Sequence, residues 1–198
     1  TQKLSGKDDH FFRVSSTTRE YADRSADFHA KTHHARRLVA AYDIGNRSFT
    51  ENWLENFTDS FTRRRGTIVD AIGFSTQDES TFFGLAKALL THDSDGILII
   101  ANSMDSALIC QQIRKLDKEI YITLADWGAT ERLLELGGRA IEGVTVVQTF
   151  DRDNTAPAYR TFRKAYMESF QREPGFPGVY THDAAHVVLT ALAAREKG

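Results

Sequence analysis

The sequence is poor in cysteine and proline, and it lacks any long apolar run. It contains one cysteine, Cys110, and three prolines among 198 residues. A single cysteine excludes an intramolecular disulfide and a multi-cysteine metal site. Cys110 lies in an apolar helical pattern over residues 107–113, where we expect a buried, unreactive thiol. No apolar stretch approaches the roughly 18 residues that a membrane span requires.

The chain also lacks an excess of charge of one sign. Its 25 basic and 27 acidic residues give a net charge of -2. Such a balance provides no broad attraction to nucleic acid or to an anionic membrane. The basic run Arg63-Arg64-Arg65 follows a helical pattern, where favourable interaction with the helix dipole is the simpler interpretation. Nucleic acid is therefore not an expected partner.

Motifs for catalysis are absent as well. The sequence has no G-x-G-x-x-G, no G-x-x-x-x-G-K-[ST] and no G-x-S-x-G pattern. The pairs His29/His33 and His182/His186 have the i, i+4 spacing that could hold a metal, but neither has an obvious third ligand. We therefore expect no catalytic residue, no metal site and no cofactor, and we do not expect an enzyme.

What the sequence does contain is a regular alternation of strand and helix patterns. The predicted strands cover residues 38–42, 67–72, 96–100, 119–124 and 143–149. The predicted helices between them cover residues 51–64, 80–91, 105–116 and 130–136. This alternation predicts an α/β fold of three layers, αβα, with a mainly parallel, doubly wound sheet. The strand at 97–100 is apolar throughout, as burial on both faces requires.

Short sequence signals mark the ends of several predicted helices. Ser48-Phe-Thr-Glu51 has the form of a capping box at the start of one helix, and Gly66 can end that helix. A helix over residues 18–33 is expected to be capped by Thr17 or Thr18. Phe11-Phe-Arg-Val14 is predicted to be a short strand.

After residue 149 the pattern is helical only. Helices are predicted over 158–171 and 179–196, with Pro157 suited to the first turn of the former. The last helix has a broad apolar face that needs a sheet to cover it, so we expect part of a second lobe to be missing and a homodimer to be possible. Thr1 is not a natural first residue, so a missing signal peptide says nothing about export.

Polar and aromatic residues gather where the predicted strands end. The carboxyl ends of parallel strands meet at one edge of a sheet, so these loops are expected to converge. The candidate ligand-binding residues are Asn46, Arg47, Ser48, Phe49, Asn102, Ser103, Met104, Asp126 and Trp127.

Each type of side chain in this set has a chemical use. The neutral polar groups beside helix N-termini suit a carboxylate, and Asp126 suits an ammonium group. Phe49 and Trp127 provide flat apolar walls for a small molecule. The alternative is structural, since Ser48 and Ser103 could simply cap helices. Asp105 could do the same, and Asp43 could stabilise its own loop.

The order of several segments resembles type I periplasmic solute-binding proteins of the branched-chain amino acid (Leu/Ile/Val) class. The segments are Arg37-Leu-Val-Ala-Ala-Tyr-Asp43 with Asn46-Arg-Ser-Phe-Thr50, Gly137-Gly-Arg-Ala-Ile-Glu-Gly143, Ala158-Tyr-Arg-Thr-Phe-Arg-Lys-Ala-Tyr166, Tyr180-Thr-His-Asp-Ala-Ala185 and Phe11-Phe-Arg-Val14. The resemblance covers nearly the whole chain. It implies the end of lobe one and a crossover in residues 1–17, lobe two in 18–149, and a return crossover with lobe-one helices in 150–198.

The resemblance implies a receptor whose two lobes close on a ligand. Such a receptor works in the periplasm or outside the cell and delivers an amino acid or similar small polar solute to the membrane permease of an ABC importer. Asp126 matches an acidic position that holds the ligand's ammonium group. Ser103 or Met104 stands where some relatives have a covering aromatic, and the spacing of the loop from Asn46 to Phe49 also differs.

Two other functions remain open at this point. The same module could sense a ligand for a fused signalling module, such as a receptor kinase, which sequence beyond Gly198 would reveal. It could also be the effector core of a transcriptional repressor, which would need a helix-turn-helix upstream.

Overall fold

A computed structural model describes residues 6–77 and 82–195 of the chain. These residues form two compact units. One consists of residues 17–147, and the other combines residues 6–16 with the segment from 148 onward. No helix in the described ranges is both long and apolar enough to cross a membrane.

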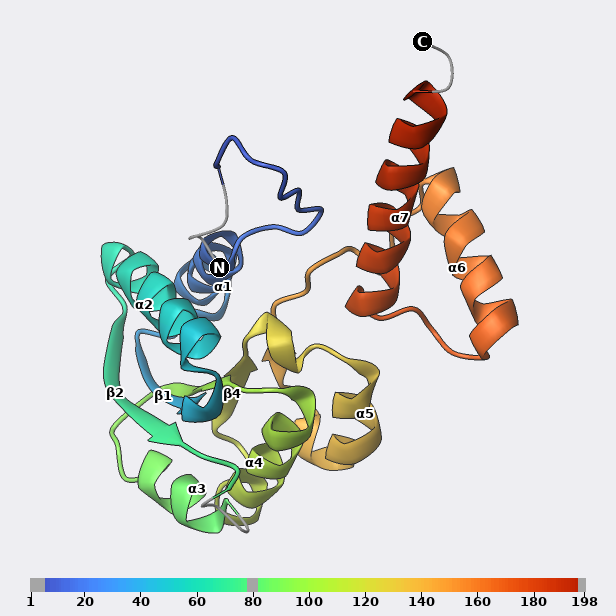
Figure 1. The fold of residues 1–198 in the computed structure, drawn as a ribbon. Coiled ribbons are helices and arrows are strands. Elements are labelled where there is room, and N and C mark those ends of the chain that lie inside the picture. Colours follow the sequence, from blue (N-terminus) through green and yellow to red (C-terminus); the bar gives the residue numbers. More distant parts are fainter. Residues whose placement is uncertain (1–5, 78–81, 196–198) are drawn as a thin grey trace. The chain divides into compact units, whose positions relative to one another are not determined.

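The larger unit contains a five-stranded sheet (Figure 1). All neighbouring strands are parallel, and the strand order is β2-β1-β3-β4-β5. The strands are β1 (Arg37–Asp43), β2 (Thr67–Phe74), β3 (Gly96–Ile100), β4 (Tyr121–Leu124) and β5 (Thr145–Val146). The predicted parallel sheet is confirmed. The predicted length of the last strand was too great, because only Thr145 and Val146 pair with β4.

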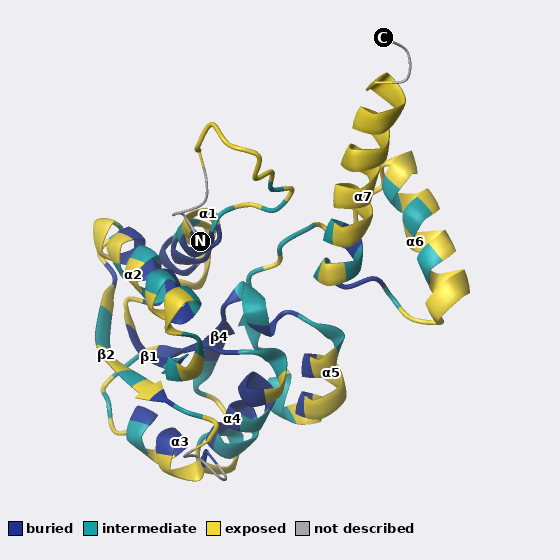
Figure 2. Cartoon of the chain, viewed as in Figure 1, coloured by how far each residue is buried: buried dark blue, intermediate teal, exposed yellow. Residues whose placement is uncertain are grey.

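Helices cover both faces of this sheet. On one face lie α1 (Thr18–Phe28) and α2 (Arg47–Arg63), which pack against alternate strand residues such as Leu38 and Ala40. On the other lie α3 (Phe83–Leu89), α4 (Ser103–Leu116) and α5 (Glu131–Gly137), packed against Val39 and Ala41. Figure 2 shows the buried residues concentrated where these layers meet. The three-layer prediction is confirmed.

The first residues of α1 and α2 can be compared with the predicted helix caps. Thr17 caps α1 as predicted: its hydroxyl accepts from the Glu20 N–H, and the Glu20 carboxylate accepts from the Thr17 N–H at 2.6 Å. The capping box predicted at Ser48 and Glu51 is wrong. A 3₁₀ turn over Ile44–Asn46 leads directly into α2 at Arg47, so Ser48 already lies inside the first turn and is exposed.

Gly66 ends α2 through its backbone, as predicted. Its N–H donates to the Phe61 carbonyl at 2.9 Å, which satisfies one of the last carbonyls of the helix. The residue in the left-handed conformation is Arg65, with a φ of 64°. A side chain at Gly66 would meet the Phe61 ring at 2.4 Å, so close packing is what requires glycine here.

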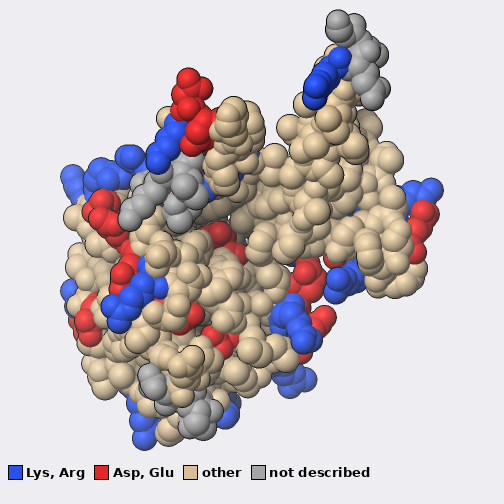
Figure 3. All heavy atoms as spheres, viewed as in Figure 1, with Lys and Arg blue, Asp and Glu red and all other residues tan. Residues whose placement is uncertain are grey.

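Charges of both signs are mixed over the visible surface of the molecule (Figure 3). The basic run after α2 pairs with α1: Arg64 lies 3.0 Å from carboxylate oxygens of both Asp23 and Asp27, and Arg63 lies 3.7 Å from Asp23. These arginines therefore join two helices.

The smaller unit contains α6 (Pro157–Phe170) and α7 (Phe176–Arg195). Pro157 occupies the first turn of α6 as predicted. Rings of the two helices meet at Phe162 and His182, whose centroids are 4.4 Å apart. The apolar face of α7 is exposed, with Leu189 65% accessible. The strand predicted at residues 11–14 is wrong: these residues form a loop in which Phe12 is 83% exposed.

Candidate functional site

The strand order places a topological switch point at one edge of the sheet. Because β2 and β3 lie on opposite sides of β1, the connections leave β1 and β3 in different directions at their carboxyl ends. Ligands of doubly wound proteins bind at such a switch point. The loop after Asp43, the loop after Ile100 and the loop after Leu124 all start at this edge. We call this edge the rim.

The two aromatic candidates of the rim touch each other. Phe49 is in the first turn of α2, and Trp127 is in a 3₁₀ turn, Asp126–Gly128, that follows β4. Their ring centroids are 5.5 Å apart, with the ring planes at 73°. Both side chains are half-buried. Residues 78 positions apart in the chain thus form one apolar wall, in the edge-to-face geometry that aromatic pairs prefer.

Asp126 is held by a residue that the sequence did not indicate. The indole Nε1 of Trp53 donates to Asp126 Oδ1 at 2.8 Å. Burial raises the pKa of Asp126, while the bond from Trp53 acts in the opposite direction and lowers it. The indole thus orients the carboxylate and engages one of its oxygens. Helical spacing placed Trp53 on the buried face of α2, but no short-range signal links it to Asp126.

The candidates after β3 have identifiable structural partners. Asn102 caps α4, because its Oδ1 accepts from the N–H groups of Met104 and Asp105, both at 3.0 Å. The Ser103 hydroxyl accepts from the Thr130 hydroxyl at 2.7 Å, which joins the start of α4 to the segment before α5. Met104 is 52% exposed. The cap of α4 is therefore Asn102, which was expected only as a ligand-binding candidate, and not Ser103, for which capping was the alternative.

The remaining candidates begin α2. Asn46 precedes the helix, but its side chain makes no capping bond, and its carbonyl accepts from Thr50 Oγ1 at 3.2 Å. Arg47 and Ser48 are exposed, and Arg47 lies 3.6 Å from Glu51. The Arg47 and Ser48 side chains are therefore on the solvent-exposed side of the rim.

Asp105, in the first turn of α4 at the rim, was expected from the sequence only as a possible helix cap. Asp105 is fully buried, and its Oδ2 accepts from Asn102 Nδ2 at 2.6 Å and from Thr76 Oγ1 at 3.3 Å. Within the described ranges its Oδ1 has no hydrogen-bond partner. Burial raises the pKa of Asp105, and the nearby Asp43 raises it further. The three-residue spacing from Asn102 indicates the reciprocal cap, whereas Thr76 carries no signal.

Metal and thiol chemistry have little support. In residues 6–77 and 82–195, no three His, Cys, Asp or Glu side chains are grouped so as to hold a metal ion. Cys110 is fully buried, and burial raises the pKa of its thiol to about 12. The prediction of a buried thiol is confirmed.

Comparison with known proteins agrees with this architecture. A family model described as periplasmic binding protein matches residues 3–197. Among solved structures, the leucine-binding protein LivK from Thermotoga maritima is 24% identical, with a TM-score of 0.84 over 91% of this chain. LivJ from Streptococcus pneumoniae, solved with isoleucine, is 17% identical, with a TM-score of 0.72 over 86% of this chain. An ABC transporter solute-binding protein from R. palustris, solved with benzoate, is 16% identical, with a TM-score of 0.79 over 88%.

The chain spans about half the length of these solved proteins: 51% of LivK, 48% of LivJ and 47% of the benzoate complex. A search of functionally curated proteins finds no match.

Proposed function

The chain belongs to the periplasmic binding protein family, and we propose that it supplies one ligand-binding half of an extracytoplasmic receptor. In this proposal the rim forms one jaw of a cleft, and a second lobe closes over it. The observation that carries the proposal is the contact between Phe49 and Trp127, because it turns two distant loops into one wall at the switch point.

We propose an amino acid or a similar small polar solute as the ligand. Leucine, isoleucine and benzoate, found with solved proteins of this fold, each combine a carboxylate with an apolar group. On this chain, the wall of Phe49 and Trp127 would receive the apolar group. The N-termini of α2 and α4 favour a nearby carboxylate, and Asp126 would attract an ammonium group.

The proposed partner is the membrane permease of an ABC importer. The support comes from the names of solved relatives, among them LivJ, a branched-chain amino acid transporter substrate-binding protein. A receptor of this kind acts in the periplasm or outside the cell. In this proposal it binds and releases its ligand without changing it.

The two tryptophans of the chain provide a direct test. Trp127 lies on the wall, and Trp53 holds Asp126, so each indole N–H reports a different part of the site. We would titrate the chain with leucine, isoleucine, valine and polar amino acids, following both indole signals in ¹⁵N NMR spectra. We expect the Trp127 signal to move at millimolar concentrations, because the proposal assigns only one half of the cleft to the rim.

Two variants test the role of Asp126 in this titration. Asp126→Asn should weaken binding of amino acids but leave binding of a carboxylate without an ammonium group nearly unchanged. Glu142→Gln removes an exposed carboxylate elsewhere and serves as the control. The proposal fails if no amino acid or carboxylate moves the Trp127 signal, and the role of Asp126 fails if both variants behave alike.

A further inference from the structure

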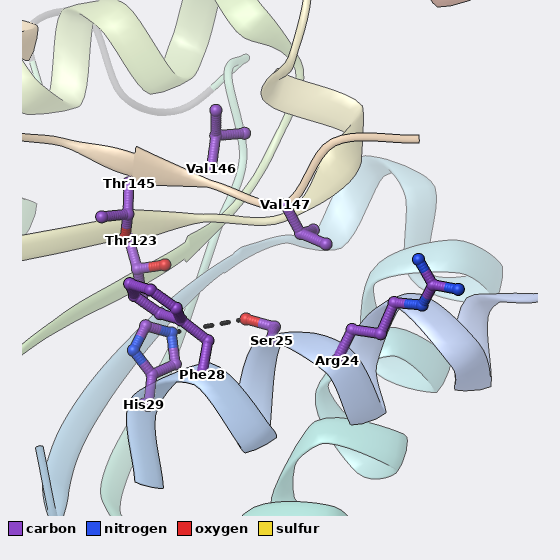
Figure 4. A pocket seen from close by; sticks show the side chains of 8 residues that line it. All are labelled: Arg24, Ser25, Phe28, His29, Thr123, Thr145, Val146 and Val147. Atoms are coloured by element: carbon purple, nitrogen blue, oxygen red, sulfur yellow. Dashed lines mark hydrogen bonds between the residues drawn. The ribbon is translucent and has the colours of Figure 1, made fainter. Parts of the chain in front are cut away.

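A second pocket lies between α1 and the part of the sheet formed by β4 and β5 (Figure 4). It has a volume of about 420 Å³, within the range of small-molecule sites. Its lining residues come from α1, from the π-helical turn His29–His33 that follows α1, from β4 and from the segment around β5. They are Arg24, Ser25, Phe28, His29, Thr123, Thr145, Val146 and Val147. None of them belongs to the rim residues described above.

One end of this pocket is polar and uncharged. His29 is 1% exposed, and its Nδ1 lies 3.2 Å from the Tyr121 hydroxyl. That hydroxyl also bonds to Thr145 Oγ1. On the other side of the ring, Nε2 is 3.4 Å from Ser25 Oγ, a long contact that a better-placed hydroxyl could replace. This end can therefore exchange hydrogen bonds with a neutral polar group.

The Phe28 ring lies at the same end as His29, with the two ring centroids 5.5 Å apart, and an arginine lies at the other end (Figure 4). Phe28 is 39% exposed, and the half-buried Val147 packs against the same core cluster as α1. Arg24 is exposed and lies at the end of the row opposite His29 in Figure 4. At spacings of three or four residues, Arg24 neighbours Phe28, and Ser25 neighbours both Phe28 and His29. At the rise of an α-helix, Arg24 and His29 are about 7.5 Å apart along the axis.

From this sequence of groups along α1, we infer that the pocket is a second ligand site, for a short aliphatic carboxylate with a hydroxyl at its far end. The carboxylate pairs with Arg24, the chain packs against Phe28 and Val147, and the hydroxyl bonds among Ser25, His29 and Thr145. The spacing along the helix fits a chain of about six carbons. This site is independent of the amino acid site proposed at the rim.

The test compares three probes of equal length: 6-hydroxyhexanoate, hexanoate and hexane-1,6-diol. Each is titrated into the chain while backbone amide signals of α1 and β5 are followed by NMR. We expect 6-hydroxyhexanoate to bind best and to move the signals of Ser25, Thr145 and Val147. The indole signal of Trp127 should stay in place, which separates this site from the rim.

Paired variants of one helix test the charge. Arg24→Gln should weaken binding of 6-hydroxyhexanoate by about two- to fivefold, the range for an exposed ion pair, and should leave the diol unaffected. Arg19→Gln makes the same change at an exposed position of α1 outside the pocket. The inference is overturned if the diol binds as well as the hydroxyacid, or if both variants behave alike. It is also overturned if no probe binds, as expected if another strand pairs with β5 on the side where the described sheet ends and fills the pocket.

Discussion

His29 should make the stability of the chain depend on pH between about 6.5 and 4. Burial, with a smaller contribution from His33, lowers the pKa of His29 from 6.5 to about 4. The ring packs against Ser25, Tyr121 and Phe57, and the titratable ring of His33 lies 6.5 Å from it. The folded protein therefore keeps this imidazole uncharged at neutral pH.

The direction of this pH dependence follows from proton binding in the folded and unfolded states. In the unfolded chain His29 takes up a proton as the pH falls below about 6.5, whereas in the folded chain it does so only near pH 4. Within this window the unfolded state binds more protons, so acidification destabilises the fold. At 1.36 kcal/mol per pKa unit, this shift lowers the free energy of unfolding by about 3 kcal/mol once the pH has reached 4.

The assay is urea denaturation of the chain and of His29→Gln at a series of pH values from 7.5 to 4. Glutamine does not titrate, so the free energy of unfolding of the variant should fall less, by about 3 kcal/mol over the window. Carboxyl groups such as Asp105 and Asp126 also have shifted pKa values, but they are common to both proteins and cancel in the difference. His10→Gln, at an exposed position, is the control and should follow the unaltered chain.

The result that refutes this reasoning is a constant difference in stability between the chain and His29→Gln from pH 7.5 to pH 4. A pKa near 6.5, measured from the imidazole signals of His29 by NMR, would refute it as well.

Three further changes test other parts of the structure. Trp53→Phe removes the donor to Asp126 and should lower the free energy of unfolding, measured by urea denaturation, by about 1–3 kcal/mol. The same substitution in an Asp126→Leu background should lower it much less, and equal losses in the two backgrounds would contradict the pairing. Gly66→Ala forces a methyl group against the fully buried Phe61 ring and should lower the free energy of unfolding by about 1–3 kcal/mol. An unchanged midpoint in urea denaturation would show instead that the ring can move. The exposed apolar face of α7 should drive self-association in sedimentation experiments, and Leu189→Glu should reduce it; a monomer at all concentrations would count against this prediction.

Features that depend on neighbouring residues were predictable. The fully apolar run of β3 indicated a central strand, and β3 lies in the middle of the sheet. Thr17, one of the two expected caps, marks the start of α1, and the structure adds the reciprocal bond from Glu20. The capping box predicted at Ser48 failed, because α2 begins one residue before it, at Arg47: Asn46, with a φ of -125°, is the N-cap residue, and Ser48 is already helical.

Features that depend on a partner were less predictable. Residues 11–14 have the apolar, β-prone character of a strand, but they form a loop, because a strand needs a neighbour to satisfy its backbone hydrogen bonds. Only two residues of the last predicted strand pair with β4, for the same reason.

By itself, the sequence determined that the candidate loops lie at one edge of the molecule. Alternating strands and helices require parallel strands, and parallel strands have their carboxyl ends at the same edge. Only the tertiary structure decided which side chains meet there: Phe49 with Trp127, and Trp53 with Asp126. It also decided that His29 is buried. These contacts join residues far apart in the chain, and they depend on packing and burial, which no local pattern of residues records.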